Sequence, residues 1–235
     1  MRRRQLGEAD RIVTLFTQEH GKIEAVAKGA RRPRSHLAGR LEFGNECSLE
    51  MHRGRSLDVI VAAEILRAHW TQIVEPARYV VASVIAELVD AFSEPEMAMP
   101  DVYELLCRAV AAVATSSAPG ALLPRFSLRL LDLLGLAPPL ESCIRCGGAL
   151  SRERMWLDAQ AGGVLHDACR ERWRDLAELQ PVDLDNLRAL ARPKGGDAVV
   201  AATPGSASAA EELIAHHLGR RPKATAELNE LGAGR

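Results

Sequence analysis

The fold is decided by residues 11–28, which read RIVTLFTQEHGKIEAVAK. The first run is rich in β-branched side chains and ends at a turn-like Glu-His-Gly sequence. From there onward apolar and charged side chains alternate, with Ile23, Ala25 and Ala27 on one face. The two runs therefore predict a β-hairpin.

Further strand patterns flank a polar segment. Residues 46–52 alternate strictly between apolar and polar side chains, residues 53–56 resemble a turn, and residues 57–65 predict another strand. Residues 29–40 are too polar and too rich in Gly and Pro to be core, so they predict a connector. Four or five short strands without intervening helices predict a small closed β-barrel over residues 1–70.

After Trp70 the apolar period changes from 2 to 3.6 residues, which predicts a helical domain over residues 71–235. Pro76 and Pro100 are placed to open helices, because proline is favoured at the first helical position. Further helical patterns lie at residues 122–134, 171–179, 184–191, 209–218 and, weakly, 224–231, while residues 204–210 predict a loop. The predicted fold class is α+β, a barrel followed by helices, with an irregular insert at about residues 141–170.

The charge of the chain is unevenly distributed. The 235 residues carry a formal net charge of -1, which alone argues against a polyanion partner. Residues 1–40, however, hold ten basic and four acidic side chains, a net charge of +6, so the remainder carries -7. No apolar run approaches the 18 or so residues of a membrane span, and no apolar core follows the amino-terminal arginines, so neither a membrane helix nor a secretory signal is expected.

The basic residues of the first part predict binding to nucleic acid. Lys28, Arg31, Arg32, Arg34 and Arg40 lie within thirteen residues, and positions 25–40 contain no acid. The residues expected to contact DNA are Arg2, Arg3, Arg4, Lys22, Lys28, Arg31, Arg32, Arg34, Arg40, Arg53 and Arg55. Because the only aromatic side chains here are Phe16, Phe43 and Trp70, we expect phosphate contacts to dominate, with sequence-independent, strongly salt-dependent binding.

The irregular insert contains a metal-binding pattern. Cys143, Cys146, His166 and Cys169 give the spacing C-x2-C-x19-H-x2-C, in which two close pairs can enclose a tetrahedral zinc ion. Four protein ligands close the coordination sphere, so one structural Zn²⁺ is expected rather than a catalytic ion. The five cysteines are an odd number in a chain without an export signal, which argues against a disulfide framework.

Catalytic motifs are missing from the sequence. There is no GxxxxGK[ST], no GxGxxG after a strand, no GxSxG and no HExxH. A zinc hydrolase would need an open coordination position and a base, and neither is found. We therefore expect no catalytic residues and no enzymatic activity.

Three segments resemble a known family. The run RRRQLGEADRIVTLFTQEHGKIEAVAKGARRPRSHLAGRLE is similar to the amino-terminal signature of the bacterial RecO family of recombination mediators. RFSLRLLDLLGLAP followed by CIRCGG, and LIAHHLGRRPKA, resemble the helical domain of that family. The resemblance implies an OB-fold head, a helical body with a zinc knuckle, and a cytoplasmic, nucleoid-associated role in RecF-pathway repair. It further implies binding to single- and double-stranded DNA, strand annealing, and loading of RecA, with RecR, onto DNA coated by single-strand-binding protein (SSB).

Two positions depart from the family pattern. Family members begin several residues earlier, with an apolar strand, so Met1 falls inside that strand here. We therefore expect either a curtailed first barrel strand or a start assigned too late. The third ligand position is commonly cysteine in the family and is His166 here, which is also a competent zinc ligand.

The resemblance also implies a site for the acidic, apolar carboxy-terminal tail of SSB. Arg125 and Arg129 lie beside Leu122 and Phe126 on the helix expected at residues 122–134, a combination that suits an acidic peptide with an aromatic end. The alternative is an ordinary amphipathic helix with exposed arginines.

A second class of function stays open from the sequence. A zinc-ribbon transcriptional regulator would bind duplex DNA sequence-specifically through a basic knuckle. The arginines available for this are Arg145, Arg152, Arg154, Arg170 and Arg172.

Overall fold

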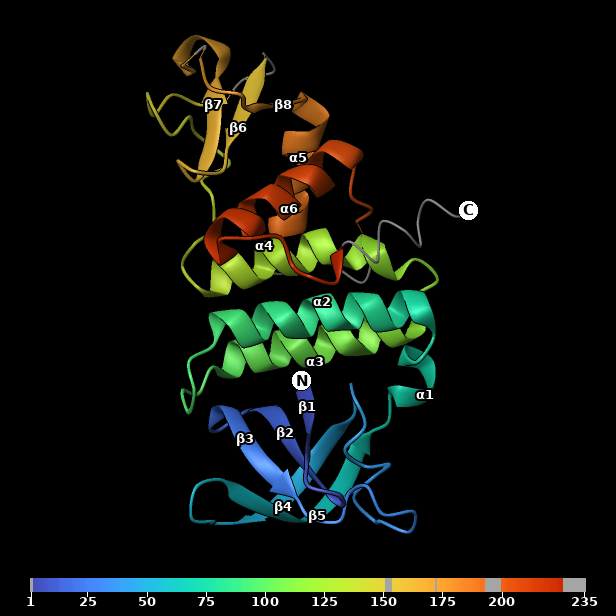
Figure 1. Ribbon diagram of the computed structural model, residues 1–235. Helices are drawn as coiled ribbons and strands as arrows, with labels where there is room; N and C mark the ends of the chain where they lie inside the picture. Colours follow the sequence, from blue (N-terminus) through green and yellow to red (C-terminus); the bar gives the residue numbers. More distant parts are fainter. Residues whose placement is uncertain (1, 151–153, 172, 193–199, 226–235) are drawn as a thin grey trace. The chain divides into compact units, whose positions relative to one another are not determined.

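The computed structural model describes residues 2–150, 154–171, 173–192 and 200–225 (Figure 1). The chain forms two compact units. Unit 1 runs to Gly120 and includes the described residues from Lys223 to Thr225, and unit 2 is Ala121–Pro222. The α+β fold class is confirmed, with a strand-rich start and helices after it.

A five-stranded sheet opens unit 1, with the order β1-β2-β3-β5-β4. Its strands are β1 (Arg2–Leu6), β2 (Asp10–Thr17), β3 (Gly21–Ala27), β4 (Glu46–His52) and β5 (Asp58–Arg67). The predicted hairpin of residues 11–28 is confirmed, since β2 and β3 pair from Arg11↔Ala27 to Thr17↔Gly21. Gly21 has φ +60°, and a Cβ there would lie 1.7 Å from the carbonyl oxygen of Met97, so glycine is required at this turn.

Closure of the sheet into a barrel is not confirmed. β1 and β4 are the two edges of the sheet, and no pairing between them is found among the described residues. β1 is only five residues long, and β4 carries register irregularities at Glu46/Cys47 and Glu50/Met51 that bend a strand locally. β3 and β5 pair in parallel, and the sheet is OB-like rather than a closed barrel.

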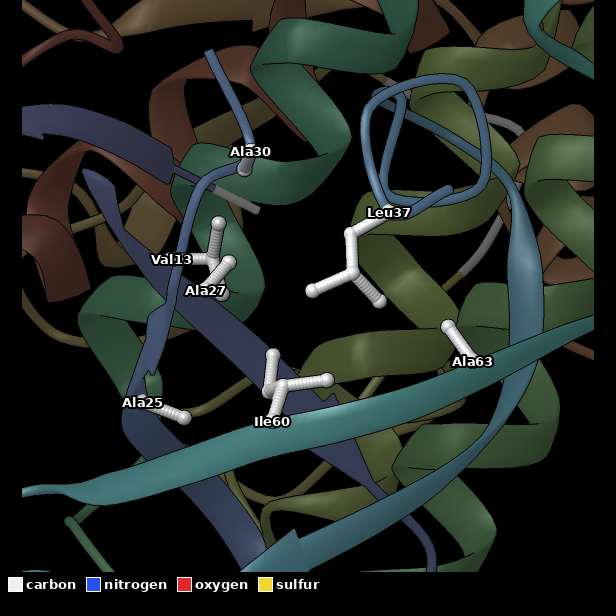
Figure 2. Packing of buried hydrophobic residues seen from close by; sticks show 7 residues of the cluster. All are labelled: Val13, Ala25, Ala27, Ala30, Leu37, Ile60 and Ala63. Atoms are coloured by element: carbon white, nitrogen blue, oxygen red, sulfur yellow. The ribbon is translucent and has the colours of Figure 1, made fainter. Parts of the chain in front are cut away.

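The core of the sheet includes residues from the connector. Val13, Ala25, Ala27, Ile60 and Ala63 point into it from β2, β3 and β5. Figure 2 shows that Ala30 and Leu37 join them from the segment between β3 and β4, and each is only 2 % exposed. The expectation that this segment contributes nothing to the core is therefore wrong.

Three helices complete unit 1. They are α1 (Trp70–Ile73), α2 (Pro76–Phe92) and α3 (Pro100–Thr115), and the predicted starts at Pro76 and Pro100 are confirmed. The Glu75 side chain caps α2 by accepting from the backbone N–H groups of Ala77 and Arg78. α2 and α3 lie side by side in Figure 1, and the Lys22 ammonium donates to the Asp90 carbonyl oxygen at 2.7 Å, which links β3 to α2.

Unit 2 combines three helices with a small sheet (Figure 1). The short turn η1 (Pro119–Leu122) spans the boundary between the units. The elements of unit 2 are α4 (Leu123–Leu133), β6 (Met155–Asp158), β7 (Gly163–His166), η2 (Asp167–Cys169), β8 (Ala177–Leu179), α5 (Pro181–Ala191) and α6 (Pro204–Leu218). The sheet order is β7-β6-β8, and the predicted helices at residues 122–134 and 184–191 correspond to α4 and α5.

Two local predictions in unit 2 are wrong. Residues 171–179 were predicted to be helical, but Ala177–Leu179 form β8, which pairs with β6. Residues 204–210 were predicted to be a loop, but α6 begins at Pro204, where the Thr203 hydroxyl accepts from the backbone N–H of Ser206. Most of the weak helical pattern at residues 224–231 lies outside the described residues.

The boundary expected between residues 70 and 71 stays a prediction, and the compact units divide the chain at Gly120 instead. Helices α1–α3 thus fold together with the sheet rather than with α4–α6. Among the described helices, none has both the length and the apolar character needed to cross a membrane.

Candidate metal centre and nucleic-acid surface

The first pair of candidate ligands lies on a tight turn. Cys143 precedes Gly147, whose φ of +72° lets the chain reverse, and the Gly147 N–H donates to the Cys143 carbonyl oxygen at 2.9 Å. The Cys143 N–H donates to the Gly148 carbonyl oxygen at 2.8 Å, and Ser142 forms a bridge with Ala149. These bonds hold Cys143 and Cys146 on one side of a closed knuckle.

The second pair comes from the end of the small hairpin. His166 is the last residue of β7, and Cys169 ends the single turn η2. The Nε2 atom of His166 lies 3.0 Å from the Ala149 carbonyl oxygen, and its Nδ1 atom lies 3.5 Å from the Cys146 sulfur. Nε2 therefore carries the proton and donates to the carbonyl, which leaves the Nδ1 lone pair free for a metal.

The four side chains fit a metal ion. The ligand atoms of Cys143, Cys146, His166 and Cys169 all lie within 4.8 Å of one another. Tetrahedral zinc, with metal–ligand distances of about 2.0–2.3 Å, needs ligand atoms roughly 3.6–3.8 Å apart. The predicted ligand set is thus brought together as a group that could hold a metal ion.

Ionisation of the thiols supports this fit. Burial raises the pKa of Cys143, but hydrogen bonds from the backbone N–H groups of Cys146, His166 and Arg145 outweigh it and lower that pKa to about 6. Hydrogen bonding with Cys146 and burial raise the pKa of Cys169 to about 11. The protein thus favours the thiolate form of Cys143 and disfavours that of Cys169, whose deprotonation a bound cation would promote.

A layer of paired charges surrounds the knuckle. Trp156 donates its Nε1–H to Asp167 at 2.8 Å, and the guanidinium of Arg170 lies 3.6 Å from the centroid of the Trp156 ring. Arg170 is also 3.4 Å from the Asp167 carboxylate. These contacts position the segment that contains His166 and Cys169.

The other knuckle arginines are also paired with acids. Arg145 donates to Glu171 at 2.8 Å and to the Cys169 carbonyl oxygen at 3.1 Å, and Arg154 pairs with Glu178 at 3.1 Å. Arg152 and Arg172 lie outside the described residues. The described arginines therefore stabilise the knuckle rather than forming an unpaired basic surface on it.

The basic connector, residues 28–40, is a structured segment. Backbone bonds tie it to the turn after β1, since the Arg31 N–H donates to the Ala9 carbonyl oxygen at 2.9 Å and the Gly29 N–H donates to Asp10 at 2.8 Å. Between its buried residues Ala30 and Leu37, the side chains of Arg31, Arg32 and Arg34 are exposed. Among the described residues, no carboxylate pairs with these three arginines. The Arg31 guanidinium donates only to the Gly7 carbonyl oxygen, at 3.1 Å, so the three arginines carry positive charge that no described carboxylate pairs with, on a fixed backbone.

Several other residues predicted to contact DNA already have partners. Arg3 pairs with Glu42 at 2.5 Å, Arg4 with Glu24 at 3.0 Å, and Lys22 with Asp90 at 3.6 Å. The Arg40 guanidinium donates to the His36 carbonyl oxygen at 2.7 Å. Lys28, Arg53 and Arg55 are exposed, whereas the side chain of Arg2 is outside the described part. The structure thus concentrates the unpaired charge on the connector and on the turn between β4 and β5.

The four residues predicted to bind the SSB tail lie at the start of α4 and just before it. Phe126 is 3 % exposed, and Leu122 is half-buried. Arg125 donates to the carbonyl oxygens of Leu190 at 3.1 Å and Arg192 at 3.3 Å. Arg129 donates to the Ala191 carbonyl oxygen at 3.3 Å and pairs with Asp132. Both guanidiniums therefore cap the carboxyl end of α5.

Sequence comparison agrees with this architecture. The family model for the Recombination protein O N terminal matches residues 1–69, and the model for the Recombination protein O C terminal matches residues 74–225. The DNA repair protein RecO of Bifidobacterium longum is 39% identical over 195 residues, which cover 82% of this chain and 80% of that protein. The DNA repair protein RecO of Nocardioides sp. is 39% identical over 175 residues, covering 72% and 71%. The chain therefore belongs to the RecO family of DNA repair proteins.

Proposed function

We propose that unit 1 binds single- and double-stranded DNA without sequence preference, chiefly through the basic connector. The observation that carries this proposal is the exposure of Arg31, Arg32 and Arg34 on a backbone anchored by Ala30 and Leu37. Guanidinium groups form bidentate contacts with phosphates, and a fixed backbone reduces the entropy lost on binding. Phosphate contacts carry no sequence information, so the binding is general.

A salt titration with charge-neutral variants tests this proposal. The double variant Arg32→Gln/Arg34→Gln is expected to weaken binding equally for all sequences. The slope of log affinity against log salt should fall by about 0.9 for each lost duplex contact. Arg108→Gln, which removes an exposed arginine paired with Glu104 on α3, is the matched control and should leave the slope unchanged. Salt-insensitive affinity, or a strong preference for one sequence, would overturn the proposal.

We further propose that the protein anneals complementary strands and, with RecR, helps to load RecA onto DNA coated by SSB in the cytoplasm. Cationic side chains that screen two strands while leaving the base edges free would permit pairing. No catalytic turnover is proposed. The test is strand annealing measured with and without SSB, with nuclease activity assayed in parallel, and cleavage of the DNA would contradict the proposal.

The proposed ion of the knuckle is one structural Zn²⁺. Three sulfur ligands and one nitrogen ligand are the donor set typical of structural zinc, and the hydrogen bond of His166 to Ala149 fixes the imidazole in the ligating tautomer. When bound, the ion joins the two halves of the knuckle and supplies no reaction chemistry. Metal analysis of purified protein should give one zinc ion per chain.

Docking of the SSB tail on Leu122, Arg125, Phe126 and Arg129 is proposed with two structural conditions. Phe126 is only 3 % exposed, so its ring would have to become accessible before it could contact the peptide. An acidic peptide would have to compete with the carbonyl oxygens that Arg125 and Arg129 now contact at the end of α5. A carboxylate is a stronger acceptor for guanidinium than a neutral carbonyl, which supports this exchange at Arg125, whereas Arg129 already pairs with the Asp132 carboxylate. The zinc-ribbon regulator is not proposed, because the described knuckle arginines are paired with acids.

A further inference from the structure

The chain is poor in aromatic residues, yet three of them meet on one surface of unit 1. Phenylalanine, tryptophan and tyrosine together make up 4% of the sequence, with four, three and two residues. Phe43 and Tyr79 have ring centroids 5.5 Å apart, and Trp70 and Tyr79 have centroids 6.4 Å apart. We call Phe43, Trp70 and Tyr79 the aromatic cluster.

The rings leave stacking surface available. The planes of Phe43 and Tyr79 are inclined at 60° and those of Trp70 and Tyr79 at 80°, so no two rings stack face to face. Tyr79 is 42% exposed even though it lies on α2, a helix whose other face is buried. Tyr79 is therefore available for an aromatic ligand.

Positive charge accompanies the cluster. The guanidinium carbon of Arg3 lies 5.8 Å from the centroid of the Trp70 ring. Arg3 and Arg11 both approach Glu42, which leaves one excess positive charge beside the rings. Phe43 is also only three residues after Arg40, the last residue of the basic connector. In the sequence, the cluster thus begins just after the segment that is proposed to hold phosphates.

A cavity lies next to the aromatic cluster. Phe43 and Arg3 line a cavity of about 470 Å³ that extends between β2, β4 and the helices α2 and α3. Its lining combines apolar side chains with hydrogen-bonding groups such as Asn45 and Tyr103. This volume lies within the range of roughly 300–1,000 Å³ that is typical of small-ligand pockets, so the cluster adjoins a concave, mixed-polarity surface.

We propose that the aromatic cluster is a stacking site for unpaired nucleobases of single-stranded DNA. This inference rests on the proposed DNA binding and deepens it. Only unpaired bases expose their faces, because the faces of duplex bases are covered by their neighbours in the stack. The connector would hold phosphates of either form, whereas the cluster would favour single strands. The expectation that stacking contributes little overlooked Tyr79, which the helical pattern assigns to α2 without indicating its exposure.

Two substitutions of Tyr79 test the inference. Tyr79→Leu keeps an apolar side chain but removes the ring, whereas Tyr79→Phe keeps the ring and removes only the hydroxyl. For an oligothymidine strand, Tyr79→Leu should lower affinity about fivefold or more, and Tyr79→Phe should not. Affinity for a duplex and the salt slope should be unchanged in both, since no charge is altered.

Cross-linking of the wild-type protein provides a second measurement that does not depend on a variant folding correctly. A single strand carrying 5-iododeoxyuridine should cross-link to Phe43, Trp70 or Tyr79, as located by mass spectrometry. Cross-links confined to other residues would overturn the inference. So would an equal loss of single-strand and duplex affinity in Tyr79→Leu, because that result would indicate a packing role.

The failure of this inference can be told apart from failure of the proposed function. If the wild-type protein binds neither form of DNA, the proposed function itself fails. If it binds both and Arg32→Gln/Arg34→Gln weakens both, but Tyr79→Leu changes neither, only the stacking site is rejected. Thermal melting of each variant checks that the fold is retained.

Discussion

His166 uses both nitrogens of one ring, and this arrangement shows how histidine can serve as the third candidate ligand of the knuckle. Nε2 faces the Ala149 carbonyl oxygen at 3.0 Å, and Nδ1 faces the Cys146 sulfur at 3.5 Å. The backbone carbonyl of one knuckle thus orients the ligand of the other. The spacing of the four ligands predicts their convergence, but this orientation depends on the register of β6 and β7, where Met155 pairs with His166.

The first prediction concerns this residue. His166→Ala should lower zinc affinity at least tenfold and leave the knuckle with three ligands, whereas His166→Cys should retain one bound zinc ion. Competition with a chromophoric chelator gives the affinities. Equal zinc affinity in the two variants would show that His166 is not a ligand.

The second prediction concerns Arg125, for which two roles compete. If the tail of SSB docks on α4, Arg125→Ala should weaken binding of the isolated tail peptide, because it removes a charged donor worth about 1.5–3 kcal/mol. Binding to DNA should not change, and fluorescence anisotropy measures both. Unchanged peptide affinity would leave Arg125 with only its contacts to Leu190 and Arg192.

At the level of elements, the basic connector shows how a polar segment can be part of a core. Ala30 and Leu37 are both 2 % exposed, although the residues between them are polar. Composition describes an average over a segment, so two buried side chains among many exposed ones leave no periodic signal. Burial of Ala30 and Leu37 therefore holds the arginines between them in more fixed positions than the sequence suggests.

The third prediction tests this anchoring. Leu37→Ala should destabilise unit 1 by about 2–5 kcal/mol, as is usual for a large buried side chain truncated to alanine. At temperatures where the variant is still folded, affinity for DNA should also fall, because the arginines lose their fixed positions. Chemical denaturation and DNA binding measured on the same preparation check both effects. Full DNA affinity in a destabilised variant would show that the connector binds without its anchor.

Strands and helices differed in how well the sequence predicted them. β3 and β4 were predictable because each alternates between two faces, β2 because it is rich in β-branched side chains, and α2 and α3 because proline marks their starts. The helix predicted at residues 171–179 was wrong, although Arg174 and Glu178 have a helical spacing. In the structure Arg174 pairs with Asp158, and Glu178 pairs with Arg154. Only tertiary contacts decide such a case.

The prediction of a loop at the start of α6 was wrong for a different reason. The first residues of this helix are Pro, Gly, Ser and Ala, a composition typical of loops. In the structure these small residues permit close packing, since a Cβ on Gly205 would lie 2.2 Å from the Asp183 carboxylate, and the Ser206 hydroxyl donates to Asn186 at 2.6 Å. Close packing against the neighbouring α5 requires small side chains at the start of α6, and the local sequence pattern cannot indicate this requirement.

At the level of the whole molecule, the positive charge and the metal site belong to different compact units. The net charge of +6 lies in residues 1–40 of unit 1, whereas all four candidate metal ligands lie in unit 2. Helices α1–α3 belong to the same compact unit as the sheet and pack with it through contacts such as Lys22 to Asp90, while the domain boundary expected at Trp70 stays a prediction. A helical sequence pattern predicts that a segment is a helix, but it does not predict which compact unit the helix belongs to.

The fourth prediction follows from this division. Removal of the metal by a chelator should lower the melting temperature of unit 2 and leave that of unit 1 unchanged, so two separate transitions should appear in calorimetry. DNA affinity at a temperature where both units are folded should stay within about twofold of the untreated protein. A large loss of DNA affinity on chelation would show that the knuckle takes part in binding.

The two anchors of the connector also restrict its length. Surface loops usually tolerate insertions and deletions, because their backbone is held only at the ends. Here Ala30 and Leu37 each occupy a place in the core, and six residues join them. Adding or removing one residue between them would withdraw an anchor and shift every arginine along the surface. Among relatives, this span should therefore vary in which basic residues it carries while keeping the same number of positions.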